Sequence, residues 1–480
     1  MQGYTSTKGK TILIANYHMP YPPRDGADNR CVEIIQAFQT LGFEVVLFSS
    51  DLFQQTPWTK MAVKQIEDEL KIQVILYLAN TIEKQNSSSA KLQWYEYVTP
   101  SLKNYFKIVY KAIEPDIVLI NYAFWGDLAV HKKIKKSVCI IDAIDILSLN
   151  QKMADITTEH LNKGKINEPF IYAIDGANEE VLQEDFFNNK HTFSADTREF
   201  KIYDKFDITI AINSKEKETI QNNTCFTKNI YIPFSFSINR NHNTYTEPPL
   251  FVIGPNQFNF QGYLYFVKRI LPVIHQQEPD FVLEVMGDGC KYLTETRGVK
   301  LLGFVQNKSE KYSRSKFAIC PLIGATGQQL KVMEAMANGL PVIALSNVAE
   351  RCPIIHNING LIAENATEFA NYTLKLFNDP DLCFKLGQAA KDTIDNEFNK
   401  QKIIDTLASS ISNLAKPGIV KSKTRKIFWS LIFYLTKKYR LFKQKINRKM
   451  ETMLTKWKNR TKFISEKYYF IVKLLVRKDL

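Results

Sequence analysis

The sequence lacks the cysteine and histidine spacings that hold structural metals. Its seven cysteines form no Cys-x-x-Cys pair, and its seven histidines show no His-Glu-x-x-His motif. Reduced, mostly buried thiols are therefore expected in place of disulfides or zinc. An Asp-x-Asp pattern occurs at Asp379–Asp381, but its place at a helix–loop junction favours a turn over a metal site. We expect no metal and no other cofactor.

Long apolar runs are also missing. No stretch approaches the ~20 residues of a membrane-spanning helix. The polar N-terminus leads into only four apolar residues, Ile12–Ala15. A secretory signal needs a longer apolar run, so a cytoplasmic protein is expected.

Acidic residues are scarce in the last part of the chain. Residues 416–480 contain 20 Lys and Arg against three acids, whereas the preceding 415 residues carry 43 basic and 46 acidic groups. Two aromatic-rich apolar runs, Ile427–Leu435 and Tyr468–Val476, are each too short to span a bilayer. We predict a basic amphipathic helical tail on an anionic membrane surface. A partner-protein helix pair and a disordered tail are alternatives, and no nucleic-acid partner is expected because no such binding module precedes the tail.

Short Val- and Ile-rich runs alternate with amphipathic helical patterns in the rest of the chain. This alternation predicts an α/β protein with parallel sheets covered on both faces. The predicted strands are Thr11–Ala15, Val45–Ser49, Val74–Leu78, Ile117–Asn121, Val138–Asp142 and Ile208–Ile212 in a first unit, and Leu250–Gly254, Phe281–Met286, Val299–Leu302, Phe317–Leu322 and Val342–Leu345 in a second.

The expected domains follow from this restart of the pattern. Residues 1–234 form the first domain, 235–249 an Asn-rich linker, and 250–397 the second domain. The polar region Ile146–Lys190 is assigned to the first domain, and Phe398–Leu414 reads as an amphipathic helix within residues 398–415. Helices are also predicted at Asn29–Leu41 (capped by Asp28 or Asn29 and ended by Gly42), at Phe260–Gln276 with a kink at Pro272, and at Gln328–Asn338.

Ligands of open parallel sheets bind beyond the carboxyl ends of the strands. In the first half, Gly26 lies ahead of a helix whose N-terminus could approach an anion, although a plain loop and cap is an equal reading. Phe124 and Trp125 follow another strand and could stack on a sugar ring or pack in the core. Asp145 follows a third strand, as a reactive or a structural carboxylate.

The second half offers a stronger pattern. Gly324 and Gly327 precede a helix that carries Lys331 and Glu334, spaced i,i+3. A diphosphate at the helix N-terminus, a lysine on its charge and a glutamate on a ribose diol suit this layout. The alternative is a surface Lys–Glu pair worth only ~0.2–0.5 kcal/mol.

A resemblance favours the first interpretation. Residues Lys331–Ile343 resemble the donor-site signature of family 4 glycosyltransferases. Further matching segments, in the same order and spacing between Leu250 and Asp381, are Gly254–Asn256 with Asn259 and Gly262, Met286–Gly289, Leu302–Val305 and Cys320–Leu322. The first half is similar more loosely, through Gly26, Arg30, Gly42 and Ile141–Asp145.

The resemblance implies the GT-B fold, in which two Rossmann-like domains face each other and a late helix returns to the first domain. It places a nucleotide sugar on the second domain, with transfer by retention. Glu334 would hold the ribose, and Lys331 with the Gly324–Gly327 loop the diphosphate. Asn259 belongs to the same donor set. Gly26 would lie on the other side of the diphosphate, and Asp145 and Lys331 would be catalytic.

Two positions depart from the family pattern. Thr326 stands where many relatives carry a second glutamate, and Ile144 where they often carry a histidine. Arg30, Phe124 and Trp125 are assigned to the acceptor side.

The expected protein is a metal-independent glycosyltransferase on the inner face of a membrane. It would act on a glycan or lipid-linked acceptor in cell-surface polysaccharide or glycoconjugate synthesis. A nucleotide-sugar epimerase or hydrolase and an inactive binding scaffold are the alternatives.

Overall fold

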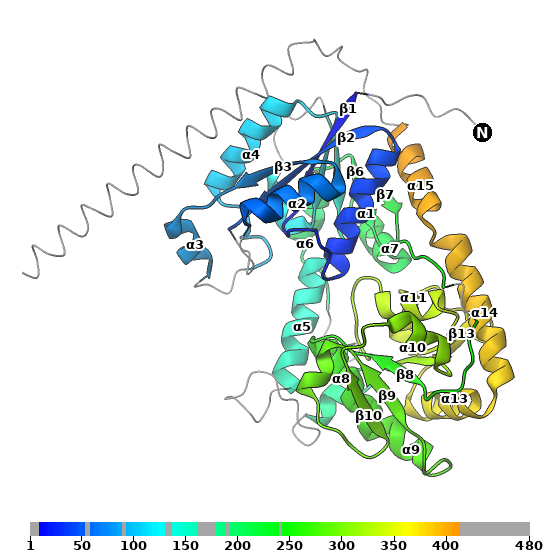
Figure 1. Cartoon of the computed structure of the whole chain (residues 1–480). Helices are drawn as coiled ribbons and strands as arrows, with labels where there is room; N and C mark the ends of the chain where they lie inside the picture. The colour runs from blue at the N-terminus through cyan, green and yellow to red at the C-terminus, as the bar shows by residue number, and fades with distance from the viewer. Residues whose placement is uncertain are drawn as a thin grey trace, which may run out of the picture. The chain divides into compact units, whose positions relative to one another are not determined.

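The computed structural model describes residues 9–52, 58–88, 93–129, 137–161, 178–187, 193–239 and 242–412. These residues contain two parallel β-sheets, each with helices packed on its faces (Figure 1). None of the helices in these ranges is long and apolar enough to cross a membrane. The predicted basic tail, residues 416–480, lies outside the described residues.

The first sheet has seven strands in the order β3-β2-β1-β4-β5-β6-β7. Its central strands are rich in Ile and Leu and are buried apart from Lys10, which is typical of a sheet covered on both faces. The strands are β1 (Lys10–Ala15), β2 (Phe43–Ser50), β3 (Gln73–Tyr77), β4 (Ile117–Asn121), β5 (Val138–Asp142), β6 (Ile208–Ala211) and β7 (Lys228–Tyr231).

The helices of this half begin at side chains that accept backbone N–H groups. Asp25 caps α1 by accepting from the Asp28 N–H group, so the helix begins earlier than either predicted cap. Gly42, with φ of 81°, follows the helix end as predicted. The helical segments are α1 (Gly26–Thr40), α2 (Lys60–Leu70), α3 (Thr81–Ser88), α4 (Pro100–Ile113), η1 (Ala123–Leu128), α5 (Leu147–Leu161), η2 (Glu179–Leu182), α6 (Thr197–Tyr203) and α7 (Ser214–Asn223).

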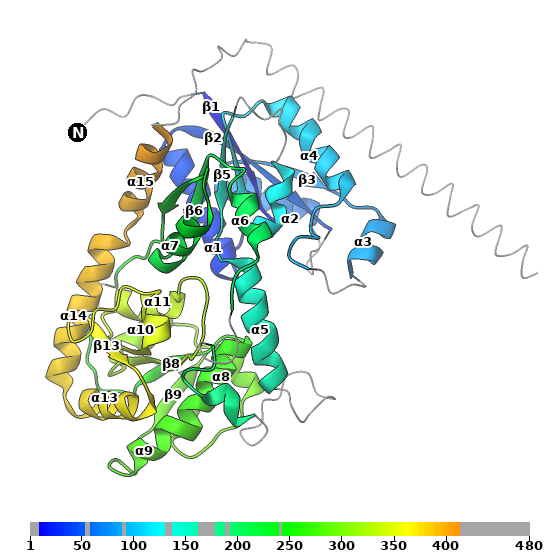
Figure 2. The same ribbon diagram turned by 180° about the vertical axis from the view of Figure 1, so that it is seen from behind.

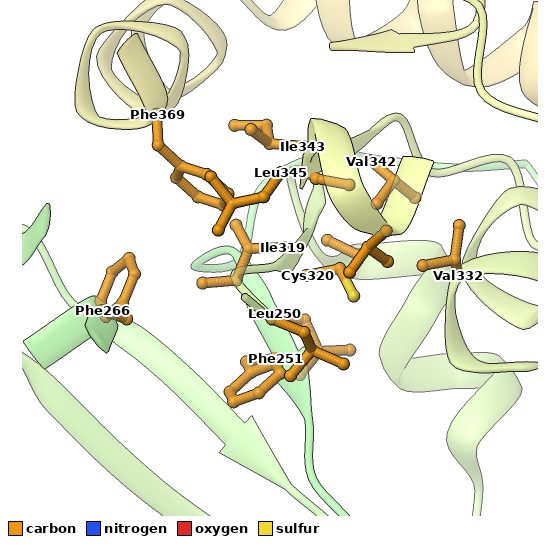
Figure 3. Packing of buried hydrophobic residues seen from close by; sticks show 14 of the residues in the cluster. Leu250, Phe251, Phe266, Ile319, Cys320, Val332, Val342, Ile343, Leu345 and Phe369 are labelled. Atoms are coloured by element: carbon orange, nitrogen blue, oxygen red, sulfur yellow. The ribbon is translucent and has the colours of Figure 1, made fainter. Parts of the chain in front are cut away.

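The second sheet has six strands in the order β10-β9-β8-β11-β12-β13. Residues of β8, β11 and β12, with Val332 and Phe369 from the covering helices, form its hydrophobic core (Figure 3). The strands are β8 (Leu250–Val252), β9 (Leu283–Met286), β10 (Val299–Gly303), β11 (Ala318–Cys320), β12 (Val342–Leu345) and β13 (Gly360–Ala363).

The predicted helix Phe260–Gln276 is divided into three segments. A π-helical segment, η3, lies directly before α9, in which Pro272 cannot donate a backbone hydrogen bond. Asp379 caps α14 by accepting from Leu382, and Pro380 occupies the first turn, so the Asp-x-Asp pattern is a helix start. The segments are α8 (Gln257–Tyr265), η3 (Phe266–Ile270), α9 (Leu271–His275), η4 (Asp288–Tyr292), α10 (Lys308–Arg314), α11 (Leu330–Ala337), α12 (Ser346–Ala349), α13 (Ala366–Asn378), α14 (Pro380–Glu397) and α15 (Lys400–Ser412).

Residues 147–161 and 178–187 pack differently from their expected assignment to the first domain. Side chains of α5 and η2, together with Phe186 and Phe187, belong to the hydrophobic core of the second sheet. The Gln261 side chain of α8 donates to the Val181 carbonyl, and Tyr265 donates to Glu184. The sequence pattern did not predict this packing, because the contacts come from a few widely spaced apolar residues in a mainly polar region.

Helix α15 lies against α1 of the first sheet (Figure 2). Ile403, Ile404 and Leu407 are buried in the same hydrophobic cluster as Ile34 and Phe38. The chain therefore crosses from the second sheet to the first after α14.

Candidate functional site

Strand order reverses once in each sheet, and the candidate residues gather at these reversals. In the second sheet β8 and β11 are neighbours, although their outgoing connections run to opposite sides. Such a switch point opens a crevice beyond the carboxyl ends of the strands. Asn259 follows β8, whereas Gly324, Thr326, Gly327, Lys331 and Glu334 follow β11.

Lys331 is a cation with a neutral partner. Its Nζ donates to Asn259 Oδ1 at 2.7 Å, and a Cβ on Gly254 would stand 3.5 Å from that nitrogen. Both side chains line a small cavity whose other walls include Phe251 and Val332. Burial lowers the pKa of Lys331 to about 8. Among the described residues no carboxylate forms an ion pair with Lys331, so the site favours an anionic ligand.

Glu334 lies one turn further along α11. Its Oε2 accepts from the Tyr312 hydroxyl at 3.1 Å, and its Oε1 lies 3.4 Å from Lys308 Nζ. Its side chain is 32% exposed, so the carboxylate remains open to a ligand.

The loop between β11 and α11 contacts carboxylates that follow strands of the first sheet. Thr326 donates its hydroxyl to Asp145 Oδ2 at 3.0 Å, and Asn150 donates to the same oxygen at 2.7 Å. The Gly327 N–H group donates to Glu216 Oε1 at 2.7 Å. Gly327 has φ of 66°, a left-handed conformation that suits glycine. The two halves of the molecule therefore meet through hydrogen bonds at their strand ends.

Burial is the main cause of the raised pKa values of Asp145 and Glu216. It raises the pKa of Asp145 to about 6, against the lowering effect of the hydrogen bonds from Thr326 and Asn150. Burial, followed by the nearby Asp145 charge, raises the pKa of Glu216 well above its usual range. Among the described residues, neither Asp145 Oδ1 nor Glu216 Oε2 has a hydrogen-bond partner, although both atoms are buried.

Two predicted glycines lie where a side chain would collide. A Cβ on Gly26 would stand 2.5 Å from Leu330 Cδ1, so the start of α1 touches the start of α11. A Cβ on Gly324 would stand 1.9 Å from the Phe187 ring. Close packing against the rigid ring therefore requires glycine at position 324, whereas the end of the flexible Leu330 side chain could move away from a side chain at position 26.

Arg30 and Trp125 do not lie on a surface that could receive an acceptor. The Arg30 side chain is fully buried, pairs with Asp142 at 2.8 Å and donates to the carbonyls of Ile232 and Pro233. Trp125 is also fully buried, in the core beneath η1. Both are structural, because a buried guanidinium needs full pairing and a buried indole offers no face to a sugar. Phe124 is partly exposed and stacks on Tyr122 at 5.0 Å between ring centroids.

Sequence reasoning missed three residues of the site. Glu216 was not singled out, and Asn150 and Phe187 lie in the polar region Ile146–Lys190, whose pattern is unclear. The sole available signal for Glu216 was its place shortly after a predicted strand end. Its partner, Gly327, is distant in sequence, so the contact could not be anticipated.

One group in the described residues could hold a metal ion. Ligand atoms of His18, Asp25 and Asp28 lie within 4.8 Å of one another. Arg24 donates to the Asp28 carboxylate, and Asp25 caps α1. These carboxylates thus have partners within the protein.

Comparison with solved structures places this architecture in a known class. The chain is similar to HepE from Anabaena in complex with UDP and glucose (TM-score 0.53, 13% identity, 84% of this chain and 100% of that one). It is also similar to sucrose-phosphate synthase from Thermosynechococcus elongatus (TM-score 0.57, 15% identity, 84% and 99%). A third is a TarM variant from S. aureus in complex with Fondaparinux, alpha-GlcNAc-glycerol and UDP (TM-score 0.55, 10% identity, 83% and 99%). The shared fold is the two-Rossmann-domain GT-B fold.

Sequence comparison finds similarity to a known family in the second half of the chain. Residues 247–379 match the family Glycosyl transferases group 1. A curated relative from Haemophilus influenzae, described as an uncharacterized glycosyltransferase, is 25% identical over 159 residues. That match covers 31% of this chain and 44% of the relative's length. Residues 247–379, which match the family, contain Asn259, Lys331 and Glu334 of the candidate site.

Proposed function

We propose that this protein is a glycosyltransferase that moves a sugar from a nucleotide-sugar donor to a glycan or lipid-linked acceptor. The observation that carries this proposal is Lys331, a half-buried cation with an amide partner, at the strand-order switch of the second domain. A nucleoside diphosphate supplies the negative charge that this cation lacks. The UDP bound to HepE and TarM in their own structures supports a nucleotide donor for this chain.

Each residue of the site has a proposed role. Lys331 and the Gly324–Gly327 loop stabilise the charge that grows on the leaving diphosphate, and Glu334 holds the ribose. Gly26 brings the N-terminus of α1 close to the same diphosphate. Asp145, held by Thr326, lies on the first-domain side of the reacting sugar, and Phe124 borders the acceptor. We further propose transfer with retention, without a metal ion.

A donor screen tests the proposal directly. The full chain is heated with a panel of nucleotide sugars, and a donor at ~100 times its dissociation constant should add ~2.7 kcal/mol of stability. Lys331→Met should remove most of this shift, whereas Lys385→Met, at an exposed lysine of α14, should keep it. No shift with any nucleotide sugar would contradict the proposal.

Turnover separates transfer from the rival activities. The donor that binds is incubated with and without glycan and lipid-linked acceptors, and products are analysed by NMR. Transfer that keeps the anomeric configuration supports retention. Donor consumed without acceptor would instead indicate an epimerase or hydrolase, and binding without turnover a scaffold.

We also propose that residues 416–480 attach the enzyme to an anionic membrane, in support of cell-surface glycan synthesis. The net charge of this segment and its aromatic-rich apolar runs support the proposal. Sedimentation with anionic and neutral vesicles compares the full chain with a chain that ends at Ala415. Binding should require anionic lipid and the segment, and equal behaviour of the two chains would contradict this role.

A further inference from the structure

The Glu334 carboxylate is held from two sides by α10. Tyr312 donates its hydroxyl to Oε2 at 3.1 Å, and the Lys308 ammonium group lies 3.4 Å from Oε1. Each carboxylate oxygen therefore has one fixed partner from the protein.

The two partners differ in how firmly they are placed. Tyr312 is fully buried in the core of the second sheet, whereas the Lys308 side chain is 49% exposed. Burial and then the Glu334 charge raise the pKa of the Tyr312 hydroxyl well above its usual range, so it remains a donor at working pH. Tyr312 consequently fixes the orientation of the carboxylate, whereas the exposed Lys308 side chain constrains it less.

Counting lone pairs shows what this carboxylate can still accept. An ionised carboxylate offers about four acceptor positions, two on each oxygen. Tyr312 and Lys308 use one on each, which leaves one free position on each oxygen. Two neighbouring hydroxyl groups, such as the 2′ and 3′ hydroxyls of ribose, could donate to these two free acceptor positions.

We propose that Tyr312 is a positioning residue that orients the Glu334 carboxylate toward the two ribose hydroxyls, and that this orientation sets how strongly the site prefers ribonucleotide over 2′-deoxyribonucleotide donors. The inference rests on the proposed function, in which Glu334 binds the ribose. With Glu334 held by Tyr312, a 2′-deoxy ligand leaves one desolvated carboxylate position without a donor. Sites that hydrogen-bond a ligand hydroxyl reject analogues lacking it for this reason.

Titration calorimetry on the full chain tests this. The ligands are UDP, ADP, GDP and CDP with the matching 2′-deoxy diphosphates. For the base that binds, wild type should prefer the ribonucleotide by about tenfold or more. Tyr312→Phe should weaken ribonucleotide binding about fivefold with little effect on the deoxy ligand, so the ratio falls. When Tyr312→Phe is combined with Glu334→Gln, it should change ribonucleotide affinity little beyond the effect of Glu334→Gln alone.

Tyr263→Phe is the matched control. Tyr263 is fully buried in the same core, and its hydroxyl donates to the Thr294 carbonyl, away from Glu334. It should leave the ribo-to-deoxy ratio at the wild-type value.

The outcomes separate this inference from the proposed function. No binding of any nucleoside diphosphate would overturn both. Binding without ribose preference in wild type would overturn the inference alone. An unchanged ratio in Tyr312→Phe, or an equal loss for both ligands, would show that Tyr312 merely supports the fold.

Discussion

The surroundings of Lys331 change the pKa of its side chain. An exposed lysine is charged throughout the physiological range, but burial lowers the pKa of Lys331 to about 8. The free protein thus holds this cation at a cost, which an anionic ligand offsets. Function and stability therefore oppose each other at this position.

The first prediction concerns the pH dependence of diphosphate binding. As pH rises through about 8, Lys331 in the free protein loses its proton and affinity for a nucleoside diphosphate should fall. Above pH 8, binding should take up a proton, because the bound anion favours the charged lysine. Calorimetry in buffers of different ionisation enthalpy measures this uptake. Affinity independent of pH between 7 and 9 would contradict the role of Lys331.

The second prediction concerns the stability of the free protein. The folded-state pKa of Lys331 lies below the unfolded value, so the folded state binds fewer protons between pH 8 and 10 and its stability rises with pH there. Lys331→Met should remove this rise and stabilise the free protein at pH 7 by about 1–3 kcal/mol. Urea unfolding at pH 7 and 9 gives both values. Lys385→Met should change neither.

At the scale of elements, close packing joins loops that the sequence pattern left unassigned. The Phe187 ring lies on Gly324, in the loop ahead of α11. The segment containing η2 thereby supports the loop that contacts Asp145 and Glu216. Loop placement here depends on a side chain from a distant element.

The third prediction tests this support. Gly324→Ala should destabilise the protein by about 1–3 kcal/mol, because the new methyl group overlaps the Phe187 ring. Adding Phe187→Ala should recover part of this loss, although Phe187→Ala alone creates a cavity. A double-mutant cycle from urea unfolding measures the coupling. Strictly additive effects would mean that the two residues do not interact.

At the scale of the whole molecule, contacts of two kinds link the sheets. One is the pair of carboxyl groups that receives the Thr326–Gly327 loop, and the other is α15, which packs on α1. The first is electrostatic and depends on protonation. The second is apolar and does not.

The fourth prediction concerns the carboxyl contact. The folded-state pKa of Asp145 is about 6, above the unfolded value of ~3.9. The folded state therefore binds more protons between pH 4 and 6, and its stability should fall as pH rises through that window. Asp145→Asn should reduce this fall, whereas Asp127→Asn, at an exposed acid of the same half, should not. Chemical unfolding at pH 4.5 and 6.5 compares them, and equal slopes in all three proteins would contradict the assignment.

The fifth prediction concerns α15. Leu407→Ala should lower the free energy of unfolding by about 2–5 kcal/mol, because Leu407 is fully buried beside Ile34 and Phe38. Hydrogen exchange should rise in α1, far away in the sequence. Ser409→Ala, on the exposed face of α15, serves as control. Unchanged protection of α1 would argue against the packing.

The sequence by itself determined most strands and the candidate residues of the second domain. Val- and Ile-rich strands are local features, so eleven of the thirteen strands in the described residues were predicted to within a few residues, whereas only four helices were predicted. Lys331 and Glu334 were found because their spacing belongs to one helix. The edge strands β7 and β13 were missed: each has four residues, and β7 alternates exposure while β13 begins with glycine.

Only the tertiary structure decided which partners these residues have. Arg30 became a buried ion pair with Asp142, and Glu216 accepts from Gly327. Tyr312 was an unremarked helix residue until the fold brought it to Glu334. Burial sets the pKa values of Lys331 and Asp145, and burial depends on contacts between elements. A sequence pattern records which residue types recur along the chain, whereas desolvation and long-range hydrogen bonds exist only once the sheets and helices have packed.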